Sequence, residues 1–149
     1  NKGEVKMSSL TDFLKGNVRE VKNEEVIVSK RFGPENNPTK WIIRQLTAKE
    51  NKNLRRKYTK RIKDKLGRIT EEFDSEKYQE DYMVRSIVFP DLSDAELQKS
   101  WGALGEYDLL EKMLTADELA NLQIKISGFV EEEIVEDSLE NQIEEVKNV

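Results

Sequence analysis

Residues 25–46 read EVIVSKRFGPENNPTKWIIRQL, and this stretch carries the clearest fold signal in the chain. Its two ends are rich in β-branched and aromatic side chains, which favour strands. The centre, residues 33–38, combines glycine, two prolines and two asparagines, a composition typical of turns. We therefore predict a β-hairpin over residues 25–46 with a long loop. An isolated hairpin is marginal in water, so it must pack on helices or gain another strand.

Helical signals dominate the rest of the chain. Capping boxes at residues 47–50, 93–96 and 115–118 mark three helix starts. The first begins a basic helix over about 48–63, with a narrow apolar stripe, and residues 66–68 end it. The stripe consists of Leu54, Tyr58 and Ile62. The other predicted helices run from Ser9 to Gly16, from Asp74 to Phe89 before Pro90, from Ser93 to Trp101, over 107–114, and from Thr115 to Gly128.

The final residues combine acidic composition with helical apolar spacing at Val135, Leu139, Ile143 and Val146. This pattern predicts an acidic amphipathic helix over 129–149. Such a helix can cap its own domain, exchange onto a neighbouring copy or meet a different protein, and the pattern favours capping. The fold class is then mostly α with one β-hairpin near the N-terminus, a small α+β domain. We expect one domain over 1–149, with a frayed terminus at 1–7 and a helical body over 47–128.

Charge is unevenly distributed along the 149 residues, whose net charge is -5. Residues 49–68 hold ten basic and two acidic side chains, whereas residues 128–149 hold eight acidic side chains and one lysine. The basic stretch suits a nucleic-acid patch, a solvated helix face, or a surface that meets the acidic tail of a neighbouring copy. No helix-turn-helix, zinc-finger or RNP motif accompanies it, so we regard nucleic acid as the weaker alternative. Its candidate residues are Arg55, Arg56, Lys60 and Arg61.

Several kinds of chemistry lack the residues that they require. The chain contains no cysteine and no histidine, which removes thiol nucleophiles, Cys- or His-type zinc sites and Ser-His-Asp catalysis. Phosphate-binding glycine loops are absent, and the paired carboxylates stand at helix starts, where acids suit the helix dipole. No apolar run is long enough to span a membrane, and no signal core begins the chain. We expect an intracellular protein that is not an enzyme, with no cofactor or metal, in which Trp41 and Trp101 are core candidates.

A set of short sequence blocks resembles a known family. They read LTDFL at 10–14, VIVSKRF at 26–32, WIIRQLT at 41–47, VFPDL at 88–92, DAELQ at 94–98, GALG at 102–105 and LLEKML at 109–114. Each block is weak alone, but their order and spacing resemble the XkdN-like phage tail assembly chaperones over nearly the whole chain.

The resemblance implies a role in building long phage tails. Such proteins are thought to bind the tape measure protein before the tail tube polymerises around it, in the host bacterial cytoplasm, and to be absent from the finished particle. We expect binding by Trp101, Leu104 and the apolar tail residues Val135, Leu139, Ile143 and Val146, with self-association as an open question. The alternatives are a structural tail or baseplate component and, less favoured, a nucleic-acid-binding regulator.

Overall fold

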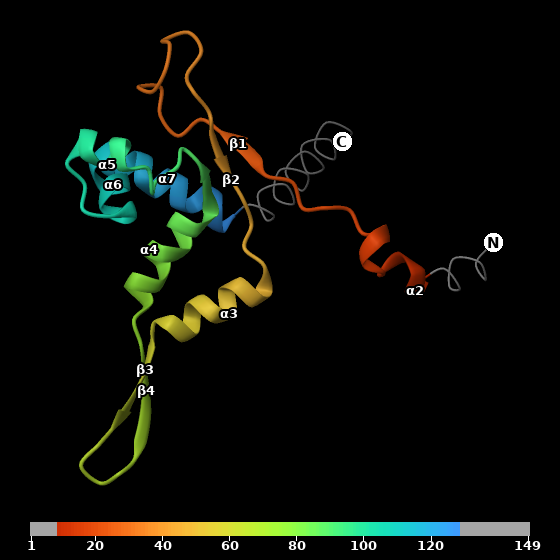
Figure 1. Ribbon diagram of the computed structural model, residues 1–149, viewed down its shortest axis with the longest axis vertical. Coiled ribbons are helices and arrows are strands. Elements are labelled where there is room, and N and C mark those ends of the chain that lie inside the picture. Colours follow the sequence, from red (N-terminus) through yellow and green to blue (C-terminus); the bar gives the residue numbers. More distant parts are fainter. Residues whose placement is uncertain (1–8, 129–149) are drawn as a thin grey trace, which may run out of the picture.

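The computed structural model describes residues 9–128, and its centre is a three-stranded antiparallel sheet (Figure 1). The strands β1 (Glu24–Val26), β2 (Trp41–Ile43) and β5 (Ile87–Phe89) lie in the order β1-β2-β5. β1 and β2 form the hairpin predicted from the sequence, with Glu24 opposite Ile43. The strands are shorter than predicted, because residues 27–40 form the connecting loop. The third strand, β5, pairs with the other edge of β2.

Four helices complete the body around one core. They are α4 (Ser75–Ser86), α5 (Ala95–Trp101), α6 (Glu106–Met113) and α7 (Ala116–Ser127). Ile43, Leu109, Leu110 and Leu122 are the largest fully buried apolar side chains, so β2, α6 and α7 meet at the centre. The other buried members of the core are Val26, Trp41, Met83, Val84, Ile87, Leu92, Met113, Leu114 and Ile126.

The helix that we predicted to run to Phe89 ends at Ser86 instead, and this prediction was wrong for three residues. Ile87 and Phe89 pair with Ile43 and Ile42 of β2, and the β-branched side chains of Ile87 and Val88 favour a strand over a longer helix. The Arg44 amide donates to the Ser86 carbonyl at 2.8 Å, so the residue after β2 satisfies the carbonyl of the last helical residue. Pairing with β2 therefore overrides the helical spacing of this segment.

The predicted basic helix over 48–63 is also too long. Its capping box is present, but α3 (Ala48–Lys57) is followed by a second hairpin of β3 (Thr59–Lys63) and β4 (Ile69–Phe73). The Asp74 amide donates to the Tyr58 carbonyl at 2.9 Å, which closes the base of this hairpin. Of the predicted apolar stripe, Leu54 is buried, Tyr58 is half-buried and Ile62 is exposed. The body over 47–128 is therefore not purely helical.

A tight turn, rather than a helix end, occupies residues 64–68. One carboxylate oxygen of Asp64 accepts hydrogen bonds from the amides of Leu66 and Arg68, at 2.9 and 2.8 Å. Gly67 has φ of 78°, a conformation that side chains disfavour. These residues reverse the chain between β3 and β4.

Two of the three predicted capping boxes are confirmed, at Thr47/Glu50 and Thr115/Glu118. The third was displaced by one residue, because Asp94 accepts from the Leu97 amide as the N-cap of α5. The Ser93 hydroxyl instead donates to Asp91 at 2.6 Å. An acidic side chain thus replaces the serine that the pattern indicated.

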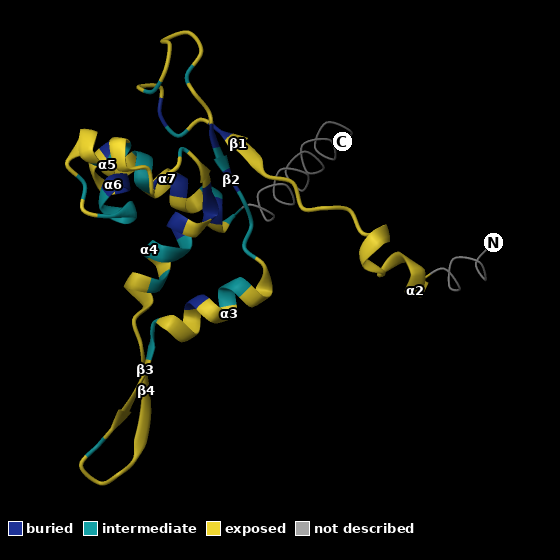
Figure 2. Cartoon of the chain, in the orientation of Figure 1, coloured by how far each residue is buried: buried dark blue, intermediate teal, exposed yellow. Residues whose placement is uncertain are grey.

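Two segments project from the body, the N-terminal arm and the β3–β4 hairpin (Figure 2). The arm contains α2 (Ser9–Asp12) and η1 (Lys15–Asn17), and every residue from 9 to 25 is exposed. In the hairpin strands only Thr59 is half-buried. The predicted frayed terminus (1–7) and acidic helix (129–149) lie outside the described residues.

The long loop of the first hairpin is fastened to the start of α7. Arg31 donates to the Met113 carbonyl at 2.8 Å and to the Glu118 carboxylate, which also accepts from the Thr115 amide. The Arg31 hydrogen bond is the main cause that lowers the pKa of Glu118 to about 2. The loop and the helix cap therefore share one carboxylate.

Two leucines provide a test of the core. We expect Leu110→Ala to lower the free energy of unfolding by about 2–5 kcal/mol, because it leaves a cavity at a fully buried position. Leu104→Ala, at a side chain that is 94% exposed, should change it by less than about 0.5 kcal/mol. Urea denaturation followed by circular dichroism measures both, and equal effects would contradict the assigned core.

Acid unfolding tests the shared carboxylate. Because the pKa of Glu118 is lowered in the folded state, its contribution is complete above the ordinary glutamate pKa of about 4.3 and is lost as pH falls toward 2. We expect Glu118→Gln to cost roughly 1 kcal/mol at pH 7, since the partner Arg31 is half-exposed. The difference from wild type should shrink between pH 5 and pH 2. Glu35→Gln, in the exposed turn, is the control, and a pH-independent loss in Glu118→Gln would contradict the assignment.

Candidate interaction surfaces

The N-terminal arm carries five large apolar side chains that the body leaves uncovered. They are between 54% and 79% exposed, and their residues are Leu10, Phe13, Leu14, Val18 and Val21. Local hydrogen bonds shape the arm, including those from the Phe13 amide to the Leu10 carbonyl and from the Asn17 side chain to the Thr11 carbonyl. Sequence reasoning predicted a terminal helix here but left its docking open. The structure shows that the arm does not pack into its own core.

The connection between α5 and α6 presents two of the predicted binding residues. Leu104 is almost fully exposed and Trp101 is 37% exposed, so the prediction of Trp101 as a core residue was wrong. Trp41, in contrast, is buried as predicted. The connection is held in place because the Leu104 amide donates to Asp108 and the Lys112 ammonium donates to the Gly102 carbonyl. Leu104 is thus displayed on a fixed loop.

The predicted basic patch is divided between two elements. Arg55 and Arg56 belong to α3, whereas Lys60 and Arg61 belong to β3. Arg61 lies 3.7 Å from the carboxylate of Glu71 on β4, and Lys60 is opposite another β4 glutamate. The acids of β4 offset the charge of β3, which reduces the support for a nucleic-acid surface. That alternative stays a prediction.

Arg55 has a different role from its neighbours on α3. Its guanidinium lies 5.0 Å from the ring centroid of Phe73 and 5.6 Å from that of Tyr78. These cation–π contacts join α3 to the base of the hairpin and to the first turn of α4.

A polar network centred on Asp81 holds α3 against α4. Its carboxylate accepts from the Tyr58 hydroxyl at 2.6 Å, from Lys57 at 3.1 Å and from Arg85 at 3.1 Å. Burial by itself would raise the pKa of Asp81, but the hydrogen bonds from Tyr58 and Lys57 outweigh it and hold the pKa below its usual value. Arg85 continues the network to Glu106 on α6. Asp81 therefore fixes the end of α3, from which the β3–β4 hairpin begins, against α4.

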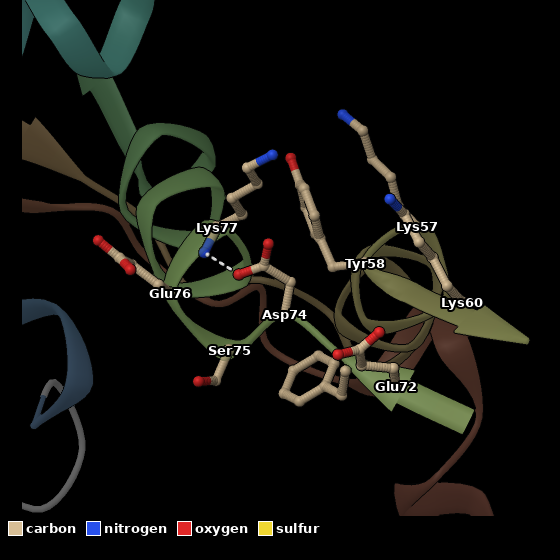
Figure 3. A pocket seen from close by; sticks show the side chains of 9 residues that line it. Lys57, Tyr58, Lys60, Glu72, Asp74, Ser75, Glu76 and Lys77 are labelled. Carbon is tan, nitrogen blue, oxygen red and sulfur yellow. Dashed lines mark hydrogen bonds between the residues drawn. The ribbon is translucent and has the colours of Figure 1, made fainter. Parts of the chain in front are cut away.

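An open hollow of about 610 Å³ lies where the β3–β4 hairpin joins α3 and α4 (Figure 3). Lysines and carboxylates both line it, so it has no single charge. Asp74 is already occupied as the N-cap of α4, accepting from the Lys77 amide at 3.1 Å. The lining residues supply no nucleophile with a base and an orienting group, and we assign the hollow no chemistry. Its lining is Lys57, Tyr58, Lys60, Glu72, Phe73, Asp74, Ser75, Glu76 and Lys77.

A second, smaller groove of about 330 Å³ lies between α3, α4 and α7. Tyr78 and Tyr82 form one wall, with ring centroids 5.9 Å apart, and the Tyr78 hydroxyl donates to the Asn51 side chain. The sequence predicted the helix that carries both tyrosines but did not single out a groove. The i, i+4 spacing was the available signal, and it is shared with ordinary core faces.

The remaining predicted binding residues, Val135, Leu139, Ile143 and Val146, lie outside the described residues. Across residues 9–128, no group of three or more histidine, cysteine, aspartate or glutamate side chains is placed to hold a metal ion. Among the helices of the same range, none is both long and apolar enough to cross a membrane.

Comparison with known proteins places this architecture among relatives. The family described as phage XkdN-like tail assembly chaperone protein matches residues 10–147. The uncharacterized protein YqbN of Bacillus subtilis (strain 168) is 29% identical over 150 residues, which span 96% of this chain and 95% of that protein. A crystal structure of the protein YqbN matches with a TM-score of 0.63 at 22% identity, covering 79% of this chain and 94% of that one. The structural match supports the fold, and the family match covers arm, body and tail.

Proposed function

Because the chain belongs to the phage XkdN-like tail assembly chaperone family, we propose that it binds the tape measure protein of a phage tail or tail-like particle. In this role it keeps the tape measure soluble until the tail tube polymerises around it. The family implies a non-enzymatic role, with binding rather than chemistry as the activity.

The observation that carries this proposal is the uncovered arm. Five large apolar side chains within residues 10–21 are more than half exposed. Contiguous apolar surface of this kind marks an interaction site on a folded protein. A tape measure is long and helical and presents apolar faces, so an apolar arm is chemically suited to it.

The Trp101–Leu104 connection is a second candidate contact. A tryptophan at the end of α5, three residues before an almost fully exposed leucine on a fixed loop, is a typical anchor in protein interfaces. The predicted binding role of these two residues therefore remains part of the proposal, whereas that of the apolar tail residues, outside the described range, stays a prediction.

The net charge suits an assembly factor. At -5, the chain repels other copies at long range, which favours a soluble complex when many copies coat one client. Weak apolar contacts, each limited to a short arm, allow the growing tube to displace the chaperone.

Co-expression with the tape measure protein tests the proposal. We expect wild type to keep the tape measure soluble and to co-elute with it in size-exclusion chromatography with light scattering. The double variant Phe13→Ser/Leu14→Ser should reduce the soluble tape measure about tenfold, since it removes two exposed apolar contacts. Its thermal midpoint should equal that of wild type, because neither side chain belongs to the core.

A matched control is Lys15→Ser/Lys22→Ser, which changes two exposed polar residues of the same arm. If wild type leaves the tape measure insoluble, the chaperone function is wrong. If Phe13→Ser/Leu14→Ser keeps the tape measure as soluble as wild type does, the function stands but the arm is not the contact. Stoichiometric recovery of the protein in purified particles, measured by mass spectrometry, would instead support a structural tail or baseplate component.

A further inference from the structure

The groove between α3, α4 and α7 has an apolar floor and aromatic walls. Met83 and Ile126, at its base, are buried core residues, and Tyr78 and Tyr82 stand beside them. The groove therefore offers a surface for an apolar helix face or strand, with polar groups from Asn51 and Ser127 at its rim.

One flank of this groove is cationic. Lys52 and Arg55 of α3 stand next to the groove rather than in its lining, and Arg55, four residues after Asn51 and three after Lys52, neighbours both on the helix surface. Neither Lys52 nor Arg55 forms an ion pair with a carboxylate of residues 9–128. The single acid of α3, Glu50, is already engaged by Arg44, whose hydrogen bond lowers the pKa of Glu50 to about 2. The flank thus keeps an uncompensated positive charge.

The chain itself contains a segment with the complementary chemistry. Residues 129–149 carry eight acidic side chains and one lysine, with Val135, Leu139, Ile143 and Val146 at helical spacing. The segment begins immediately beyond α7, whose last residue, Ser127, lines the groove. If helical, 21 residues span about 30 Å, more than the roughly 15 Å length of α3.

From these observations we infer that the groove between α3, α4 and α7 is the docking site of the chain's own acidic segment, residues 129–149. The apolar residues of the segment contact Tyr78, Tyr82 and Ile126, and its carboxylates face Lys52 and Arg55. The same copy is the occupant because a short connection holds the segment beside the groove. Such tethering gives an effective concentration on the order of mM, above that of a second copy in solution.

Cysteine pairs test the inference directly, since the full chain has no native cysteine. The test pair is Gln79→Cys, on the groove, with Leu139→Cys. The control pair is Asn121→Cys with Leu139→Cys, because Asn121 lies on the same helix as Ser127 but lines a different hollow, with Ile27 and Ile124. We expect the test pair to form an intramolecular disulfide about threefold faster, which corresponds to a docking preference of about 0.7 kcal/mol.

Charge reversal separates docking from simple proximity. Lys52→Glu should slow the test disulfide about threefold, as expected for losing one exposed ion pair and adding a repulsion. Lys99→Glu, an equally exposed lysine on α5, should leave it unchanged. Raising the salt to 1 M should act like Lys52→Glu, because the Debye length falls to about 3 Å.

Each other outcome overturns the inference. Equal rates for the two pairs mean that the segment has no preference for the groove. Disulfides that join two copies make a second copy the occupant. If the test disulfide forms fast and neither Lys52→Glu nor 1 M salt slows it, electrostatic recognition does not guide the docking. Circular dichroism of every variant confirms that the body is folded, so that a loss of cross-linking reports on docking.

Discussion

The fold of the described residues depends on one small apolar core. Thirteen buried apolar residues form it, and Ile43, Leu109, Leu110 and Leu122 are the largest that are completely enclosed. Burial of apolar surface stabilises a fold by roughly 25 cal/mol per Å², and in the described residues it is concentrated where β1, β2 and β5 meet α4, α6 and α7. Everything else, namely the arm, α3 and the second hairpin, is attached to this core with few buried apolar contacts.

Polar contacts supply the positioning that the core does not reach. Arg44 extends from the end of β2 to Glu50 with two hydrogen bonds, at 3.1 and 2.6 Å, which sets the angle at which α3 leaves the sheet. Asp81 then fixes the far end of α3 through Tyr58 and Lys57. Arg31 does the same for the long loop by joining Glu118. Bonds of this kind contribute little net stability, but they choose one orientation among several.

The sequence predicted those features that depend on local chemistry. The capping boxes at Thr47 and Thr115 and the turn at 33–38 need only neighbouring residues, and all three were recovered. The helices predicted over 107–114 and from Thr115 to Gly128 were recovered as α6 and α7. The mostly helical α+β class was confirmed for the same reason.

The errors occurred where pairing partners decide the structure. Residues 59–63 are basic and follow a helix, so their period alone did not distinguish a strand, although Thr59 and Ile62 are β-branched. Only the register with residues 69–73 and the Asp64 turn make them a hairpin. Ile87 became a strand because β2 had an open edge, which no local pattern reveals. The groove and the exposure of the arm likewise depend on which elements pack together, and a local sequence pattern does not show this.

The N-terminal arm is apolar, whereas the flank of α3 is cationic. This difference in chemistry suggests different occupants for the two surfaces. Burying the five exposed arm residues gains roughly 5–8 kcal/mol, and most of it offsets the cost of association, so in the proposed function one copy binds a client weakly. In the proposed function, retention on a long client depends on many copies side by side. Release in that scheme proceeds one copy at a time as the tube advances, with no strong site to break. The cationic flank of α3 takes no part in the proposed exchange if the chain's own acidic segment occupies it, which leaves the apolar arm and the Trp101–Leu104 connection as the proposed client surfaces.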